Sequence, residues 1–271
     1  MVTLASSQDE RHSYVLFERP AEVGPLSLTG LGYFEKALGV KDYRKHIQRW
    51  IRRPAPLVLG CLEQERMVGW AMCEPWDRRD RDSTPIFVLR MIEVAQDRRK
   101  CGIGRALVIL SGLLAPGHMV TRPLSGDSEN FFTGLGFIRP PSDCAVELRD
   151  KYGYLLLPAT AKQRLAEQNN GAITLREAIV RQCADQQRAQ VLRDEITRTT
   201  GFAQAFAAAV APGQHEPSAL SERRLIQSGT AQVPCACGRR EVAFYAIRNG
   251  ERDYLGVECV QCGRVWLTVP V

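Results

Sequence analysis

Apolar and polar residues along the first 158 positions follow two periods, one typical of strands and one typical of helices. The run IFVLRMIEV is almost continuously apolar, as in a central strand, and KDYRKHIQRWIRR combines an apolar stripe with a basic outer face. The predicted strands are residues 13–19, 57–62, 67–74, 86–94, 118–122 and 145–157, and the predicted helices are 28–38, 41–53, 105–115 and 128–134. This succession predicts an α/β fold with a mixed central sheet and flanking helices.

The composition changes after residue 158, where Ala, Gln, Arg and Glu dominate. Thr174 and Glu177 fit a capping box, which predicts a long helix over 175–198. Residues 210–230 are rich in turn formers and predict a linker. We therefore expect three parts: a mixed α/β domain over 1–158, a helical segment with a linker over 159–230, and a small β domain over 231–271.

Composition and charge narrow the class of protein. The chain has 271 residues, 45% of them hydrophobic, which is enough for a full core. Its first residues lack a basic start followed by an apolar run, and no stretch approaches the roughly 18 apolar residues that a membrane span needs, so we expect neither a secretory leader nor a membrane span. Most of the nine cysteines are scattered, which fits a reducing compartment, so we expect a cytoplasmic protein without a membrane partner. The net charge of +6 is compatible with an acidic partner such as nucleic acid, and equally with ordinary solubility.

A glycine-bearing turn, Arg99–Gly104, joins the central strand that ends at Val94 to a helix that begins near Arg105. The amides at a helix start lack partners and favour an anion, and Gly102 and Gly104 remove side chains that would obstruct a phosphate. Taken alone, the pattern also fits a plain tight turn.

The string Arg99-Lys100-Cys101-Gly102-Ile103-Gly104 has the form R-x-x-G-x-G, and residues 130–137, NFFTGLGF, form a second motif. With the element order, these motifs resemble the GNAT superfamily of acyl-CoA N-acyltransferases over about residues 13–157. The resemblance implies a GNAT-type sheet that holds acetyl-CoA where the fourth and fifth strands separate. The cofactor-binding residues that it implies are Ile92, Val94, Arg99, Lys100, Cys101, Gly102, Ile103, Gly104, Arg105 and Ser125. Ser125 is equally suited to cap the following helix.

Acyl transfer to an amine needs a group that accepts a proton. We expect Glu93, a carboxylate within the apolar central strand, to be this base, because partial burial would raise its pKa. The alternative is a structural carboxylate that faces an arginine such as Arg90. Phe132 stands where many GNAT relatives carry an acidic tyrosine, so a different group would protonate the leaving thiolate. Glu74, Asp127 and His46 are reserve candidates.

Four cysteines near the C-terminus have the spacing of metal ligands. Cys235, Cys237, Cys259 and Cys262 form two knuckles around a β-prone stretch with a predicted turn at Asn249-Gly250. They resemble a zinc ribbon, in which a structural Zn²⁺ would be held by four thiolates; two disulfides are the alternative. Interleaved basic and aromatic residues suit either nucleic-acid binding or protein docking.

Together these patterns predict an acetyltransferase that modifies an amine of a protein or an RNA and uses the ribbon as a docking module. One alternative is a regulatory or binding protein that keeps the GNAT fold without catalysis. The other is an enzyme that acetylates a small-molecule amine.

Overall fold

The computed structural model describes residues 1–53, 55–79, 85–141, 153–167, 172–198, 222–230, 237–249, 252–262 and 265–270. They form two compact units, Met1–Gln187 and Arg188–Val271. Both units contain a sheet, and the predicted mixed α/β class is confirmed. Within these ranges, no helix has the length and apolar character needed to cross a membrane.

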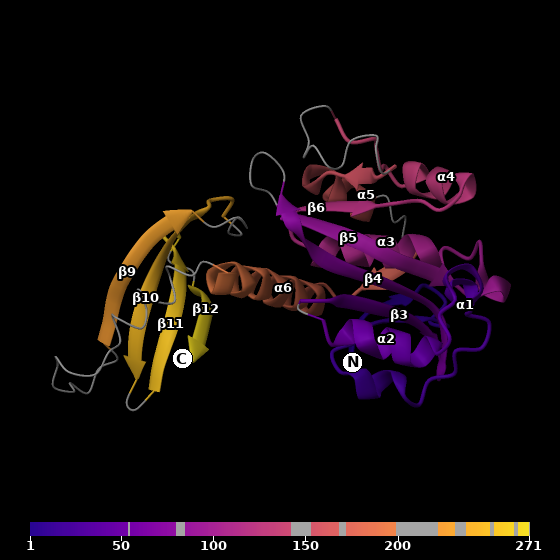
Figure 1. Ribbon diagram of the computed structural model, residues 1–271, viewed down its shortest axis with the longest axis horizontal. Helices are drawn as coiled ribbons and strands as arrows, with labels where there is room; N and C mark the ends of the chain where they lie inside the picture. Colours follow the sequence, from indigo (N-terminus) through magenta and orange to yellow (C-terminus); the bar gives the residue numbers. More distant parts are fainter. Residues whose placement is uncertain are drawn as a thin grey trace. The chain divides into compact units, whose positions relative to one another are not determined.

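The first unit is built on a single eight-stranded sheet in the order β7-β6-β5-β4-β3-β2-β1-β8, whose central strands lie side by side in Figure 1. The strands are β1 (Val2–Ser7), β2 (Ser13–Leu16), β3 (Leu57–Glu63), β4 (Arg66–Arg79), β5 (Pro85–Val94), β6 (His118–Thr121), β7 (Leu155–Leu157) and β8 (Ile173–Leu175). β5 and β6 run parallel, and the other neighbouring strands run antiparallel. The predicted β3–β4 hairpin and the central strand β5 are confirmed.

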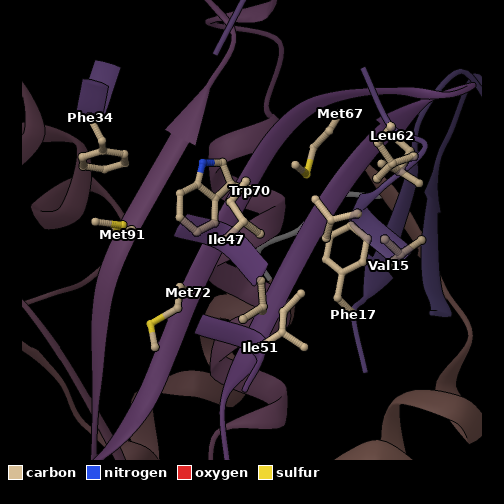
Figure 2. Close-up of a cluster of buried hydrophobic side chains, with 13 residues drawn as sticks. Val15, Phe17, Phe34, Ile47, Ile51, Leu62, Met67, Trp70, Met72 and Met91 are labelled. Carbon is tan, nitrogen blue, oxygen red and sulfur yellow. The ribbon is translucent and has the colours of Figure 1, made fainter. Parts of the chain in front are cut away.

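The helices of this unit cover both faces of the sheet. They are α1 (Tyr33–Leu38), α2 (Tyr43–Ile51), α3 (Ile103–Leu114), α4 (Gly126–Gly134), α5 (Lys162–Glu167) and α6 (Glu177–Arg198), which extends past the unit's end. Ile47 and Ile51 of α2 share a buried cluster with Trp70 and Met72 of β4 (Figure 2). A Cβ at Gly69, the preceding position of β4, would instead lie 2.8 Å from Ile103 of α3. Because side chains alternate along a strand, α2 and α3 lie on opposite faces.

The far edge of the sheet differs from the prediction. Val2–Ser7, to which no element was assigned, forms β1, and Ile173–Leu175 forms β8, which pairs antiparallel with β1. Thr174 is therefore a strand residue opposite Ser6, and the long helix begins at Glu177. The local sequence at Thr174 favours a helix start, but a strand at this position satisfies main-chain groups on the edge of β1 that would otherwise be unpaired. This pairing decides the structure of the segment.

Segments beyond residue 158 also belong to the first unit, which divides from the second at Gln187. The Lys162 ammonium of α5 donates to the Ala115 carbonyl at 2.7 Å, where it meets the negative end of the α3 dipole. The Gln187 side chain of α6 donates to the Ala55 carbonyl, also at 2.7 Å. The compact units thus divide later along the chain than the boundary predicted at residue 158.

The second unit contains an antiparallel four-stranded sheet in the order β12-β11-β10-β9, visible as one curved sheet in Figure 1. Its strands are β9 (Glu222–Thr230), β10 (Glu241–Asn249), β11 (Arg252–Cys259) and β12 (Val265–Pro270). The linker predicted over 210–230 is wrong for Glu222–Thr230, because that segment pairs with β10; residues 199–221 lie outside the described residues. Asn249 pairs with Arg252, so it belongs to the strand rather than to the predicted turn.

Candidate active site and cysteine cluster

The corner between β5 and α3 is the turn that the sequence predicts to bind a phosphate. A single 3-10 turn, η2 (Gln96–Arg98), leads from β5 to Gly102, which begins α3 with a φ of +80°. No side chain caps α3, and a Cβ at Gly102 would meet no described atom within 4 Å. The helix starts at Ile103, two residues earlier than predicted, so Ile103 and Gly104 lie in its first turn. The first amides of a helix lack intrahelical acceptors, so this corner suits an anion.

Two ion pairs fix the turn to the β3–β4 hairpin. The Arg66 guanidinium binds both oxygens of Asp97, at 2.9 and 2.7 Å, and lowers the pKa of that carboxyl group. The Arg98 guanidinium binds both oxygens of Glu63, at 3.1 and 2.9 Å. The charges of Arg66 and Arg98 are thus neutralised by their carboxylate partners, and any positive potential at the turn comes from other basic side chains. Lys100 is one, since it is exposed and forms no ion pair with the described residues.

Beside this corner, β5 is longer than its partner β6. Pairs between the two strands extend from Ile86 with His118 to Leu89 with Thr121. β5 then continues to Val94, so residues 90–94 have no strand partner on that side among the described residues. Alternate residues of such a stretch direct their main-chain groups to the open edge. Ile92 and Val94, predicted to bind the cofactor arm, lie in this stretch.

The second motif forms a small aromatic cluster under the turn. Phe132 is buried, with its ring 5.2 Å from that of Phe137, and it offers no proton. A Cβ at Gly104 would lie 3.3 Å from the Phe131 ring, so this glycine permits close approach of α3 and α4. Ser125 accepts a hydrogen bond from the Ser128 amide at 3.3 Å and caps α4, while its cofactor contact stays a prediction.

Glu93, the predicted base, is 6% exposed and bound through both oxygens. Its Oε1 accepts hydrogen bonds from the amides of Gly32 and Tyr33, at 2.8 and 2.7 Å, and its Oε2 accepts one from the Tyr43 hydroxyl. Burial raises the pKa of this carboxyl group, against the opposing effect of the two amides. The predicted alternative partner, Arg90, faces Glu74 instead, at 2.7 Å.

Tyr43 is a residue whose role the sequence did not reveal, since it appeared only as part of the apolar stripe of α2. Its hydroxyl also accepts a hydrogen bond from the indole N–H of Trp70 at 2.8 Å, and the two rings pack edge to face at 5.8 Å. Glu93, Tyr43 and Trp70 thus form a connected polar group on the α2 face of the sheet. Glu93 joins α1, α2 and β5 at one carboxylate, and it either orients these elements or accepts a proton through Tyr43.

Three cysteines of the second unit lie together. The sulfurs of Cys237, Cys259 and Cys262 are all within 4.8 Å of one another, and Cys237 and Cys259 are 3.6 Å apart with no bond between them. A tetrahedron with Zn–S bonds of about 2.3 Å has edges of about 3.8 Å, so the donor set fits Zn²⁺. The fourth predicted ligand, Cys235, lies outside the described residues.

Comparison with known proteins gives one family match and a group of similar solved structures. Residues 31–110 match the acetyltransferase (GNAT) family, and no curated protein matches the chain. Similar solved structures include "AtaTR bound with AcCoA", with 16% identity and a TM-score of 0.44 over 57% of this chain and 98% of that one. Another is the "KacTA-DNA complex", with 15% identity and a TM-score of 0.44 over 58% of this chain and 99% of that one. A third is "AtaT complexed with acetyl-methionyl-tRNAfMet", with 14% identity and a TM-score of 0.44 over 57% of this chain and 98% of that one. Residues 31–110 therefore resemble acetyltransferases of the GNAT family, in agreement with the acyl-CoA-dependent N-acyltransferase that the sequence predicts.

Proposed function

We propose that this protein transfers an acetyl group from acetyl-CoA to an amine of a macromolecular acceptor, either a protein or an RNA. The observation that carries the proposal is the stretch of β5, residues 90–94, that has no described strand partner on its β6 side, next to the start of α3, where no described side chain forms a cap. An extended thioester arm needs main-chain partners, and its diphosphate needs amide donors, and these two features offer both side by side.

In this proposal the amides at the start of α3 bind the diphosphate, and Arg99 and Lys100 add positive charge. Main-chain groups of the open edge of β5 bind the pantetheine arm. The full set of proposed cofactor-binding residues is Ile92, Val94, Arg99, Lys100, Cys101, Gly102, Ile103, Gly104, Arg105 and Ser125. The acceptor amine attacks the thioester carbonyl, the C–S bond breaks, and the amine proton passes to Glu93 while CoA leaves as a thiolate.

The cysteine cluster is proposed to hold a structural Zn²⁺, with Cys235 as fourth ligand beside Cys237, Cys259 and Cys262. Four thiolates leave no open coordination position, so this metal would stabilise the second unit rather than act on a substrate. The transfer chemistry itself does not require this second unit, so the unit serves as a docking module for the acceptor.

Titration calorimetry of the full chain with acetyl-CoA tests the cofactor site, with Gly102→Ala and Gly39→Ala as a matched pair. Both glycines have positive φ, +80° and +66°, and a Cβ at either meets no described atom within 4 Å. Both variants therefore carry a similar backbone cost of about 1 kcal/mol. Only the methyl group at 102 enters the phosphate turn, so we expect acetyl-CoA to bind at least tenfold more weakly there and within twofold at 39. Absence of acetyl-CoA binding by the unaltered chain would refute the proposal.

A second candidate, a binding protein that keeps the cofactor site without turnover, is favoured by two observations. Both oxygens of Glu93 are already bound, to Gly32, Tyr33 and Tyr43, and Phe132 cannot protonate a leaving group. Incubation of the chain with labelled acetyl-CoA and a mixture of RNA and protein acceptors distinguishes the acetyltransferase from the binding protein. Label in an acceptor supports the enzyme, and acetyl-CoA binding without any label supports the binding protein.

A further inference from the structure

Residues 41–53, which include α2, carry a concentrated positive charge. Residues 41–53 include six basic side chains and one acidic one, a net charge of +5 against +6 for the whole sequence. The acidic residue, Asp42, caps α2 by accepting the Lys45 amide at 2.9 Å, so it has a structural role. Ile47 and Ile51 are buried, which leaves the basic residues on the solvent side.

Not every basic side chain of this stretch is free to bind a partner. Arg44 donates to the main-chain carbonyls of Val23, Gly24 and Leu26, so it holds the preceding turn in place. Arg49 and Arg52 are exposed, and neither guanidinium forms an ion pair or hydrogen bond with any described residue. Arg49 lies in the last turn of α2 and Arg52 is the C-cap residue, so the two are three residues apart and their side chains are neighbours.

A chain of contacts extends this charge from α2 to β5. Arg53 binds Glu74 at 2.5 Å, and Arg90 binds the other oxygen of the same carboxylate at 2.7 Å. One carboxylate thus serves two arginines, and their side chains remain 45% and 35% exposed. Arg90 directly follows Leu89, the last residue of β5 that pairs with β6. The positive surface therefore reaches the open edge where the cofactor arm is proposed to bind.

The chemistry of this surface favours RNA among possible acidic partners. The central carbon of the Arg53 guanidinium lies over the Trp50 ring, 4.2 Å from its centroid, and an arginine held in this way can also stack on a base. Arginine also binds phosphate in a bidentate fork, which a lysine cannot do. A membrane-binding helix would instead expose large apolar residues, and those of α2 are turned to the core.

We propose that Arg49, Arg52, Arg53 and Arg90 form a phosphate-binding surface that guides an RNA acceptor to the open edge of β5. This inference rests on the proposed function and names the acceptor class. Arg49 and Arg52 bind backbone phosphates, Arg53 stacks on a base, and Arg90 binds the phosphate nearest the transferred acetyl group.

The test measures fluorescence anisotropy of a labelled single-stranded RNA with the full chain and with the double variant Arg49→Gln/Arg52→Gln. Each phosphate contact adds about 0.7 to the slope of log affinity against log salt, so losing two weakens binding roughly 25-fold at 0.1 M salt and lowers the slope by about 1.4. The matched control is Arg164→Gln/Arg176→Gln, which removes the same charge from exposed positions outside this surface. We expect the control to bind RNA within twofold of the unaltered chain.

Equal weakening by both double variants would overturn the proposal, because total charge alone would then explain RNA binding. Polyglutamate that displaces RNA at equal charge concentration, or equally tight binding of phosphatidylserine vesicles, would overturn it in favour of an acidic protein or a membrane. Acetyl-CoA titration of each variant keeps the two proposals apart. If the double variant binds both acetyl-CoA and RNA as tightly as the unaltered chain, only the proposed RNA surface is refuted, and the proposed transferase function stands.

Discussion

Replacing Glu93 by glutamine changes the charge of this side chain and keeps its shape. The carboxylate accepts hydrogen bonds from the amides of Gly32 and Tyr33 and from the Tyr43 hydroxyl. A glutamine oxygen can still accept both amide hydrogen bonds, and its NH₂ group can donate to the Tyr43 oxygen if that hydroxyl rotates. The variant therefore separates a proton-accepting role from an orienting one.

The expected loss of stability is small. Charge-assisted hydrogen bonds are worth roughly 1 kcal/mol more than neutral ones, so three weakened bonds would cost at most about 3 kcal/mol. Burial acts in the other direction, because it raises the pKa of Glu93 and so disfavours the ionised form in the folded state. A neutral amide avoids that cost of desolvation. We therefore expect the free energy of unfolding, measured in urea, to change by about 1 kcal/mol or less.

The expected loss of activity is large. A general base contributes roughly 10²- to 10⁴-fold, so labelled acetyl transfer by Glu93→Gln should fall by at least 100-fold while acetyl-CoA binding is unchanged. Transfer within about threefold of the unaltered chain, at normal stability, would refute the assignment of Glu93 as base. Glu93 would then only fix the start of α1 to β5 through Gly32 and Tyr33.

Three further predictions concern other parts of the molecule. Gly117→Ala should cost about 3 kcal/mol or more in urea unfolding, because φ is +86° and the new methyl group would collide with the Pro85 carbonyl; a loss below about 1 kcal/mol would contradict this contact. His46 accepts a hydrogen bond from the Trp50 indole, and burial lowers its pKa below 6.5, so stability should decline as the pH falls below 6.5, with a change in tryptophan fluorescence that His46→Gln abolishes. The purified chain should contain about one zinc per molecule by metal analysis, and Cys259→Ser should lose it; retention of zinc in that variant would exclude the proposed ligand set.

The elements with strong local patterns could be predicted from the sequence. The apolar run of β5, the β3–β4 hairpin and the glycine turn at Gly102 each depend on neighbouring residues, and the structure contains all three. β8 was missed because it forms through pairing with β1, about 170 residues away, while the local pattern at Thr174 favours a helix start. Long-range pairing leaves no periodic signal in a single sequence.

The candidate site shows the same division. Glu93 could be recognised as a lone carboxylate in an apolar strand, but its partners Gly32, Tyr33 and Tyr43 lie 50 to 61 residues earlier in the chain. Arg90 was expected near Glu93, yet the structure pairs it with Glu74. Which charges meet across a sheet depends on strand register and helix placement, and neither follows from spacing along the chain.

The strand β8 and the Lys162 contact to Ala115 set a lower limit on the length of an independently folding catalytic part. A fragment cut at residue 158 would expose the edge of β1 at Ala5–Ser7, and exposed strand edges of this kind can pair with other chains. It would also lose the ammonium group at the end of α3, the helix whose opposite end is proposed to bind the diphosphate. The shortest fragment suited to separate expression therefore ends no earlier than Gln187, within α6.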